Sequence, residues 1–576
     1  MSLSFTLLPA LALLLSWTVG IQTTTVLVSL ILFDGYGLLP LLKRTNSSAL
    51  IDMFRSLPRR LGHVLGQPIA ILAVVGIALT LYNWIGAIGI YSIDLGVHVY
   101  WAKVIITTQH LPNYFVVEPL DQAVKFTFGS HAMLAEFFMI NGAPIESFSW
   151  IPEVIAASGI SLGSALFTWR ATKSIASSIL AATLIGVAYH PGGYIQRGNL
   201  PDIIGYLLIL TSLYSLLKID MHETNFRYAF GLASISVIPF HQLATVILPV
   251  VLLFGLAAML VFSRTELNQI LGGLFPTNRK ILFWLGILIL ATTYMASVTY
   301  VRRDTLTQLA TSGWQPWVQP LSQYPIVIGA GLFYLGLLGL AVCFRYRTPA
   351  HMLLIAWIAA LLLLANALLI GLPVLDPQRF VWRMTEPLSI GGGIIISEAF
   401  KRMPVLYRTL SKQGPSIMSA RGGIMLGVII LPMLFLAVQV TNSVSVSQPY
   451  RFSQEFFSDD VRIGQWLRGN ASSDSIIVND ADIDTTATWV QTYSMDTHFI
   501  YKVSFGSVAA PQGYIQIYRD AEKLYKQPNS TSAYQILTKY PIGYLVAHGS
   551  EIRLFESSPY FKEVFRTGNS ALFETG

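Results

Sequence analysis

Charged residues are scarce in this sequence: of its 576 residues, only 12% are Asp, Glu, Lys or Arg. A soluble globular domain uses roughly 25% charged residues, so a chain of this length with so few charges cannot cover a water-exposed surface. Cysteine is scarcer still, because Cys343 stands alone within an apolar run. An intramolecular disulfide is therefore excluded, and the cysteine and histidine spacings of zinc sites are absent.

Apolar residues, in contrast, make up 53% of the chain, and the mean hydropathy is +0.57. They fall in blocks of membrane-spanning length, at residues 3–20, 23–42, 67–91, 151–168, 174–189, 202–217, 228–240, 243–262, 281–299, 324–343, 350–370, 385–398 and 423–441. The sequence predicts a polytopic α-helical membrane protein with about 12–13 transmembrane helices, since a hydrocarbon core requires roughly 20 apolar residues per helix. The count leaves open whether the first two blocks form one long, broken helix. The first block lacks the basic start and cleavage site of a signal peptide and is expected to be retained.

The distribution of Lys and Arg predicts the orientation, because cytoplasmic loops carry an excess of positive charge. One set of alternate loops holds 19 of these residues, whereas the other set holds only 7 before the polar tail. The residues of the poorer set are Lys103, Lys125, Arg197, Arg302, Arg303, Arg379 and Arg383. The richer set is assigned to the cytoplasm, which predicts a multi-pass protein of the cell membrane with the 91–150 loop and the tail outside.

From Asn442 onward the chain changes character, and polar residues mix with short apolar runs. Strand-like runs are Ser475–Val478 and Gly543–Ala547, and helix-like runs are Asp459–Arg468 and Thr531–Tyr540. About 130 residues suffice for an independent domain. Residues 1–442 are therefore predicted to form the transmembrane domain, and residues 443–576 an extracytoplasmic α/β domain. Glycosylation-type sequons at Asn470 and Asn529 give weak support to that location.

Ionisable groups at the outer membrane face are candidate functional residues, because polar groups there are costly and rarely idle. The first are Asp94 and His98, which directly follow a predicted span. If the helix continues, these residues share a face because they are four apart. Asp94 then suits a general base that takes a proton from an acceptor hydroxyl. The alternative, which spacing alone favours, is that Asp94 caps the start of an interfacial helix.

Later outer loops add histidines and arginines at the same face. The candidates are His190, Arg197, His241, Arg302, Arg303, Arg379 and Arg383. Arginine is the preferred partner of phosphate because its planar fork donates two hydrogen bonds at once. Five arginines in loops otherwise poor in positive charge thus indicate a phosphate-binding site. The alternative is that each arginine pairs with a lipid headgroup or a nearby Asp, and that both histidines are structural.

The first outer loop resembles that of large membrane glycosyltransferases of the GT-C class. The resemblance rests on Asp94 through His98, His110–Pro112, Phe126–His131 and Asn141–Pro144, in that order. Further loose similarities are Arg197–Pro201, with Arg197 where Trp is common, Phe240–His241, Gln378–Phe380 and the closing Ser558–Phe561. Together these motifs cover nearly the whole chain, and uncharacterised archaeal and bacterial relatives have similar outer tails.

The resemblance implies an enzyme that moves a hexosyl or pentosyl group from a polyprenyl-phosphate carrier to a glycan, lipid or protein acceptor at the outer face. Transfer in this class usually inverts the sugar, with an Asp of the first outer loop as the base, a role that Asp94 inherits. Arginines of later outer loops usually hold the carrier phosphate, which implies Arg302, Arg303, Arg379 or Arg383. The first outer loop has no Asp-x-Asp pair, so neither a metal nor another cofactor is implied.

Two other classes compete with the enzyme. A lipid or polymer transporter would place ionisable residues near the membrane midplane, whereas here they gather at one face. A non-catalytic subunit that keeps the fold without the activity is compatible with the same sequence. Membrane lipid is an expected partner, and nucleic acid is not. The tail carboxylates Asp480, Asp482 and Asp484 are interpreted as solvated loop residues rather than as a calcium site.

Overall fold

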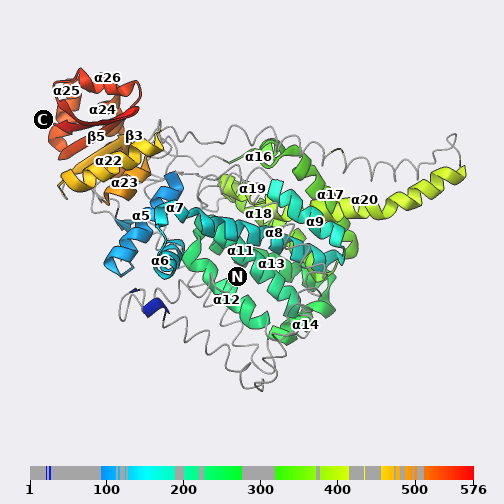
Figure 1. Ribbon diagram of the computed structural model, residues 1–576. Helices are drawn as coiled ribbons and strands as arrows, with labels where there is room; N and C mark the ends of the chain where they lie inside the picture. The colour runs from blue at the N-terminus through cyan, green and yellow to red at the C-terminus, as the bar shows by residue number, and fades with distance from the viewer. Residues whose placement is uncertain are drawn as a thin grey trace.

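The structure is a computed structural model in which a helical bundle carries a C-terminal domain with a β-sheet (Figure 1). It describes residues 21–22, 25–27, 93–111, 115–116, 123–124, 128–187, 200–219, 226–274, 318–370, 377–413, 434, 456–472, 475–480, 487–495, 499–502 and 512–576. The predicted spans at 3–20, 67–91, 281–299 and most of 423–441 lie outside these residues, as does nearly all of 23–42. The predicted number of spans therefore stays a prediction.

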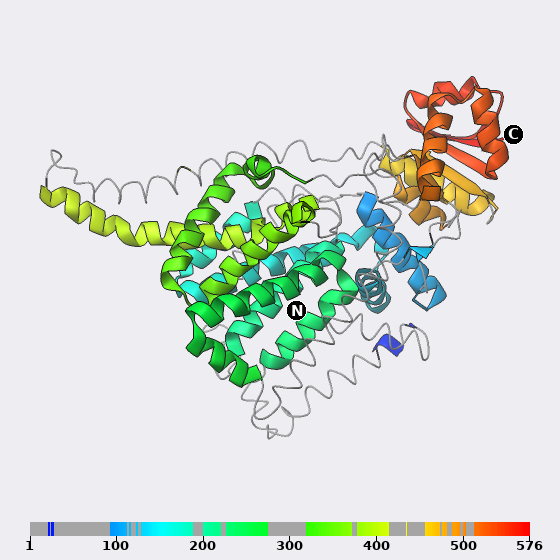
Figure 2. The same ribbon diagram turned by 180° about the vertical axis from the view of Figure 1, so that it is seen from behind.

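The bundle is built from the described helices between residues 150 and 413. They are α8 (Trp150–Thr172), α9 (Ile175–Val187), α11 (Leu200–Ile219), α12 (Phe226–Phe240), α13 (Gln242–Phe262), α14 (Arg264–Leu274), α16 (Tyr324–Ile328), α17 (Ala330–Tyr346), α18 (Pro349–Ala365), α19 (Pro377–Trp382) and α20 (Thr385–Gln413), with short 3-10 turns at Leu321–Gln323 and Ala367–Ile370. Helix α20 projects well beyond the others (Figure 2). It is longer than its predicted span of 385–398, because its basic second half continues the helix.

Several described helices have the length and composition of membrane spans. Within the described residues, Trp150–Thr172, Leu200–Ile219 and Leu243–Phe262 are long and apolar enough to cross a membrane. Residues Leu321–Ile328 and Ala330–Tyr346 also pass as a pair, bent by 111° at their break. These segments coincide with four predicted spans.

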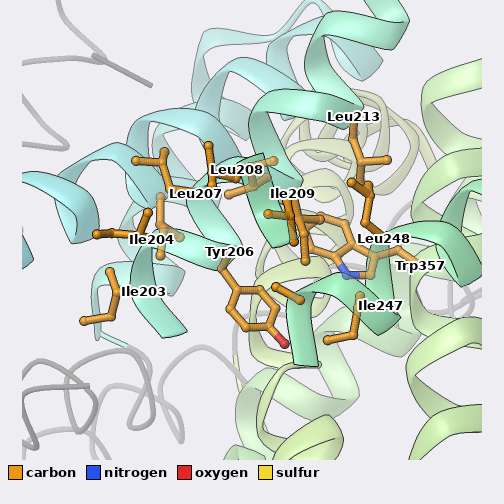
Figure 3. Packing of buried hydrophobic residues seen from close by; sticks show 14 of the residues in the cluster. Ile203, Ile204, Tyr206, Leu207, Leu208, Ile209, Leu213, Ile247, Leu248 and Trp357 are labelled. Carbon is orange, nitrogen blue, oxygen red and sulfur yellow. The ribbon is translucent and has the colours of Figure 1, made fainter. Parts of the chain in front are cut away.

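Helix α11 lies at the centre of the bundle, where nearly all of its residues are buried. A helix that is apolar on every side must be enclosed by other helices. Figure 3 shows Tyr206 and Leu213 of α11 among side chains that include Ile247 of α13 and Trp357 of α18. The first turn of this central helix also carries a buried carboxylate, Asp202.

Small residues let three helices of the bundle approach closely. A Cβ added at Gly339 of α17 would lie 1.9 Å from the backbone oxygen of Gly391 in α20. On another side of α20, a Cβ at Gly393 would meet the backbone oxygen of Ser177 in α9 at 2.5 Å. Such contacts are typical of helices packed in lipid, where association depends on close packing rather than on the hydrophobic effect.

Residues of the first outer loop form short elements between the bundle and the C-terminal domain. They are α5 (Ile93–Thr108), the two-stranded β1 (Phe115–Val116) and β2 (Ala123–Val124), α6 (Gly129–Asn141) and α7 (Ile145–Phe148). Helix α5 packs against α6. A Cβ at Gly129 would lie 2.8 Å from the backbone oxygen of Pro239, so this glycine brings the start of α6 directly against the end of α12.

The C-terminal domain contains a five-stranded sheet, which confirms the expected mixture of strands and helices. Its strands are β3 (Ile476–Asp480), β4 (Phe499–Lys502), β5 (Ile542–His548), β6 (Phe561–Thr567) and β7 (Ser570–Thr575), in the order β4-β3-β5-β7-β6. Strands β3, β4 and β5 are parallel, and the final hairpin adds antiparallel strands at one edge. The helices are α22 (Phe457–Asn470), α23 (Thr488–Ser494), α24 (Gln512–Lys526), α25 (Thr531–Lys539) and α26 (Glu551–Glu556).

Candidate active site

One end of the bundle collects buried ionisable side chains from several helices. Asp202 lies in the first turn of α11, and His241 joins α12 to α13. Arg379 lies in α19, and Arg383 in the turn between α19 and α20. Helices α11, α13 and α20 begin at this end and α12 ends there; that this end is the outer face stays a prediction from the distribution of Lys and Arg.

The centre of the site is an ion pair between Asp202 and Arg383. Both side chains are buried, and Nη2 of Arg383 donates to Oδ2 of Asp202. The other carboxylate oxygen, Oδ1, lies 3.3 Å from Nδ1 of His241. His241 comes this close to α11 because Gly205 has no side chain; a Cβ there would lie 2.9 Å from Cβ of His241.

The guanidinium of Arg383 also has partners on its other sides. Its Nη1 lies 3.3 Å from Oε1 of Glu386, one turn later in α20. The ring of Tyr206 lies beneath it, with 3.9 Å between the guanidinium carbon and the ring centroid. With two carboxylates and an aromatic face around it, and only 2% of its surface exposed, Arg383 is bound into the protein.

Arg379 occupies a different environment in the same site. It lies one turn before Arg383, whose backbone N–H donates to the carbonyl of Arg379, but its side chain is only half-buried. It lies close enough to Asp202 and His241 to act on both electrostatically. Of the two arginines, Arg379 is therefore the one placed to meet a ligand at the surface of the site.

A pair of histidines links the first outer loop to this site. Nδ1 of His98 in α5 lies 2.9 Å from Nε2 of His131 in α6, so one ring donates a hydrogen bond to the other. Both rings are buried. Burial, with a smaller contribution from the nearby His241, lowers the pKa of His98 to about 3. His98 is therefore neutral at physiological pH and fixes α5 against α6 through a hydrogen bond rather than a charge.

Asp94 lies four residues before His98 in the first turn of α5. The helix runs through both positions, as the sequence predicts for two residues that share a face. The side chain of Asp94 lies outside the described part of the structure, so its role as the base stays a prediction. His190, Arg197, Arg302 and Arg303 also lie outside the described residues.

The structure brings His98, His241, Arg379 and Arg383 together from four separate segments. The sequence does not single out Asp202, Glu386 or Tyr206 as candidates, although the two carboxylates have a signal in hindsight. Asp202 opens a predicted span, where a carboxylate is costly without a partner. Glu386 follows Arg383 by three residues, which is the spacing of an ion pair on a helix.

Within the described residues, no group of three or more His, Cys, Asp or Glu side chains has a geometry that could hold a metal ion. The expected solvation of the tail carboxylates is wrong for Asp480, which is buried at the end of β3. Asp482 and Asp484 lie outside the described residues.

The fold is similar to that of the arabinofuranosyltransferase AftD from Mycobacteria, with a TM-score of 0.51 and 14% identity over 88% of this chain and 40% of that one. Two structures of ArnT from Cupriavidus metallidurans, one bound to undecaprenyl phosphate and one in the apo state, align with a TM-score of 0.48 at 13% and 12% identity, over 87% of this chain and 97% of theirs. No protein-family model and no curated protein matches the sequence. The likeness to AftD confirms the resemblance to GT-C glycosyltransferases at the level of the fold.

Proposed function

We propose that this chain is an integral membrane glycosyltransferase that moves a sugar from a polyprenyl-phosphate carrier to an acceptor at the outer membrane face. The observation that carries the proposal is the buried polar site at one end of an apolar bundle with a GT-C fold. Buried polar groups in a membrane protein are rarely idle, and among the described residues Asp202, His241 and Arg383 meet at one end of the bundle. The polyprenyl-phosphate donor is proposed from the resemblance to GT-C glycosyltransferases. The outer membrane face is proposed from the distribution of Lys and Arg.

In the proposed reaction, an acceptor hydroxyl attacks the anomeric carbon of the donor sugar. The bond between that carbon and the phosphate oxygen breaks, and the polyprenyl phosphate leaves with the bonding electrons. Asp94 takes the proton of the hydroxyl as the general base, and attack opposite the leaving group inverts the anomeric centre. The extracytoplasmic C-terminal domain would then lie on the side of the acceptor.

The two arginines of the site take different roles in this proposal. Arg379, half-buried at the edge of the site, holds the carrier phosphate through charge-assisted hydrogen bonds. Arg383, enclosed by Asp202, Glu386 and Tyr206, has its charge neutralised within the protein and positions the start of α20. The proposal therefore narrows the phosphate clamp expected from the sequence to Arg379 among the described arginines.

Binding of a polyprenyl-phosphate sugar to the protein in lipid nanodiscs tests this assignment. Arg379→Ala should weaken donor binding by roughly 1.5–3 kcal/mol, the contribution of a hydrogen bond to a charged group, while the fold survives. Arg468→Ala is the matched control, because Arg468 is exposed at the end of α22. Equal donor binding by the two variants would show that the phosphate is held elsewhere.

Transfer assays test the base. Asp94→Asn keeps the size of the side chain but removes its ability to accept a proton, so turnover should fall by about 10²–10⁴-fold. Glu522→Gln, at a half-buried carboxylate of α24 that pairs with Lys526 in the C-terminal domain, makes the same chemical change away from the site. Near-normal turnover of Asp94→Asn would return Asp94 to the helix-capping role, and no transfer by the wild type would favour the non-catalytic subunit.

A further inference from the structure

Helix α23 of the C-terminal domain packs directly on α5 of the first outer loop (Figure 1). The contact centres on Gly96, which lies between Asp94 and His98. A Cβ at Gly96 would lie 2.3 Å from Oγ1 and 3.1 Å from Cβ of Thr488. It would also lie 3.2 Å from the indole nitrogen of Trp489. Only glycine therefore permits this approach of the two helices.

Polar contacts extend the same interface along α5. The hydroxyl of Thr492 lies 3.0 Å from the backbone oxygen of Gly96 and 3.0 Å from that of Thr488, so its single proton is shared between α5 and α23. About two turns further along α5, Nζ of Lys103 donates to the backbone oxygen of Thr492 at 2.7 Å and lies over the ring of Tyr493. Lys103 also pairs with Glu146 of α7 at 2.7 Å, so a single ammonium group joins α5, α7 and α23.

Helix α23 is in turn fixed to the sheet of the C-terminal domain. The amide of Asn479, near the end of β3, donates to the carbonyl of Ala487 at the start of α23. The side-chain oxygen of Asn479, Oδ1, lies 3.3 Å from Nε2 of His548 at the end of the neighbouring strand β5. Trp489 also packs edge-on against Phe457 of α22. A displacement of the sheet would therefore carry α23 with it.

The two faces of α5 consequently have different neighbours. Gly96 and Lys103, seven residues apart, lie on one face and meet α23. His98 lies about 200° around the helix from Gly96 and is hydrogen-bonded to α6. Asp94 shares the face of His98 by its spacing of four residues. Helix α5 is thus held between the C-terminal domain on one side and the candidate active site on the other.

We propose that α23 is a positioning element, and that Thr488, Thr492 and Lys103 are positioning residues for transfer. The inference rests on the proposed function, and it makes the C-terminal domain part of the machinery that places α5 even where it touches neither donor nor acceptor. A group added between α23 and α5 would push α5 toward α6 and the candidate active site. A misplacement of about 1 Å in a catalytic group can cost about 10²-fold in rate.

A pair of compensating substitutions tests the contact. Gly96→Ala adds one methyl group against Thr488, and kcat should fall about 10–100-fold with little change in the KM for the donor. Alanine favours a helix over glycine, so a loss cannot come from the helix itself. Thr488→Ala removes the closest atom and should restore part of the lost kcat in the double variant. Gly231→Ala and Gly469→Ala are the controls, because a Cβ at either position meets nothing within 4 Å.

A second substitution avoids any steric clash. Thr492→Val keeps the shape of the side chain and removes the hydroxyl that lies against the backbone oxygen of Gly96, so kcat should fall less than with Gly96→Ala. Thr538→Val is the matched control, since the exposed hydroxyl of Thr538 bonds carbonyls of its own helix, α25. Normal kcat in both Gly96→Ala and Thr492→Val would overturn the positioning role, as would a loss that Thr488→Ala fails to relieve.

Hydrogen exchange separates failure of this inference from failure of the proposed function. Amides of Ile93–Thr108 should exchange faster in Gly96→Ala and Thr492→Val than in the wild type and in the three control variants. This readout needs no substrate and no transfer. Faster exchange in a protein whose wild type transfers no sugar would refute the enzyme but keep the contact between α23 and α5. Unchanged exchange of α5 would refute the contact, whatever the activity.

Discussion

Removing the carboxylate of Asp202 leaves the buried guanidinium of Arg383 with one anionic partner instead of two. The perturbation is Asp202→Ala, and Glu386, 3.3 Å from Arg383, is the carboxylate that remains. Removing one partner of a buried ion pair destabilises a protein by about 3–5 kcal/mol. Because Glu386 and the ring of Tyr206 still face the guanidinium, we expect a loss near the lower end, about 3 kcal/mol.

A double-mutant cycle in detergent micelles or nanodiscs measures this cost by thermal or denaturant unfolding. In an Arg383→Met background no cation remains to be left unpaired, so Asp202→Ala should cost much less there, with a coupling energy of about 2–3 kcal/mol. The comparison is Glu556→Ala, which removes one of the two surface carboxylates paired with Arg566 and should cost no more than about 1 kcal/mol. Equal costs for Asp202→Ala and Glu556→Ala, or additivity within the cycle, would refute the buried-pair argument.

Three further substitutions probe separate features by unfolding. Among the described residues, neither carboxyl oxygen of the buried Glu136 has a hydrogen-bond partner, and burial raises the pKa of this carboxyl from 4.5 to about 9. The stability that its neutral form contributes should be full below pH 4.5 and lost as the pH rises through 9. Glu136→Gln should abolish that loss. Gly339→Ala should destabilise the bundle by about 1–3 kcal/mol through overpacking against Gly391, whereas Gly231→Ala should not. Burial alone would raise the pKa of Asp520, but hydrogen bonds, led by the one from Lys539, lower the pKa below its usual value. The ionised carboxylate therefore stabilises the wild type near neutral pH, and this stability is lost in acid. Asp520→Asn should remove it at neutral pH.

The sequence predicts the elements of the structure well where apolar runs are long or alternate with polar runs. The predicted span 243–262 coincides with the apolar segment of α13, and the tail strands lie within one or two residues of β3 and β5. Hydrophobic length and alternation report the local environment of consecutive residues, which is what fixes a helix in lipid or a strand in a sheet.

The partners within the site could not be predicted in the same way. Asp202 and Arg383 are separated by 181 positions, and their contact depends on how the first turn of α11 meets the turn between α19 and α20. The sequence marks Arg383 as a candidate phosphate ligand because an arginine at the outer face suits that role. Packing instead encloses it between two carboxylates, and this distinguishes it from Arg379.

The contact between α5 and α23 shows the same limit over a longer separation. Nothing in the local sequence of Gly96 indicates that Thr488, nearly four hundred residues later, will lie against it. Glycine permits a close approach of a neighbouring helix, but it does not by itself indicate one, since the helical Gly231 and Gly469 have no neighbour within 4 Å of an added Cβ. The neighbour itself is selected by the C-terminal sheet, which orients α23 through Asn479.

The most direct test of the central claim is transfer by the purified wild-type protein in nanodiscs, with a polyprenyl-phosphate sugar labelled in the sugar. The account predicts release of polyprenyl phosphate together with a glycosylated acceptor whose anomeric configuration is opposite to that of the donor, and loss of both products in Asp94→Asn. Donor binding without release of polyprenyl phosphate, in the presence of acceptors of all three classes, would contradict the account. Equal release by the wild type and Asp94→Asn would contradict the assignment of the base.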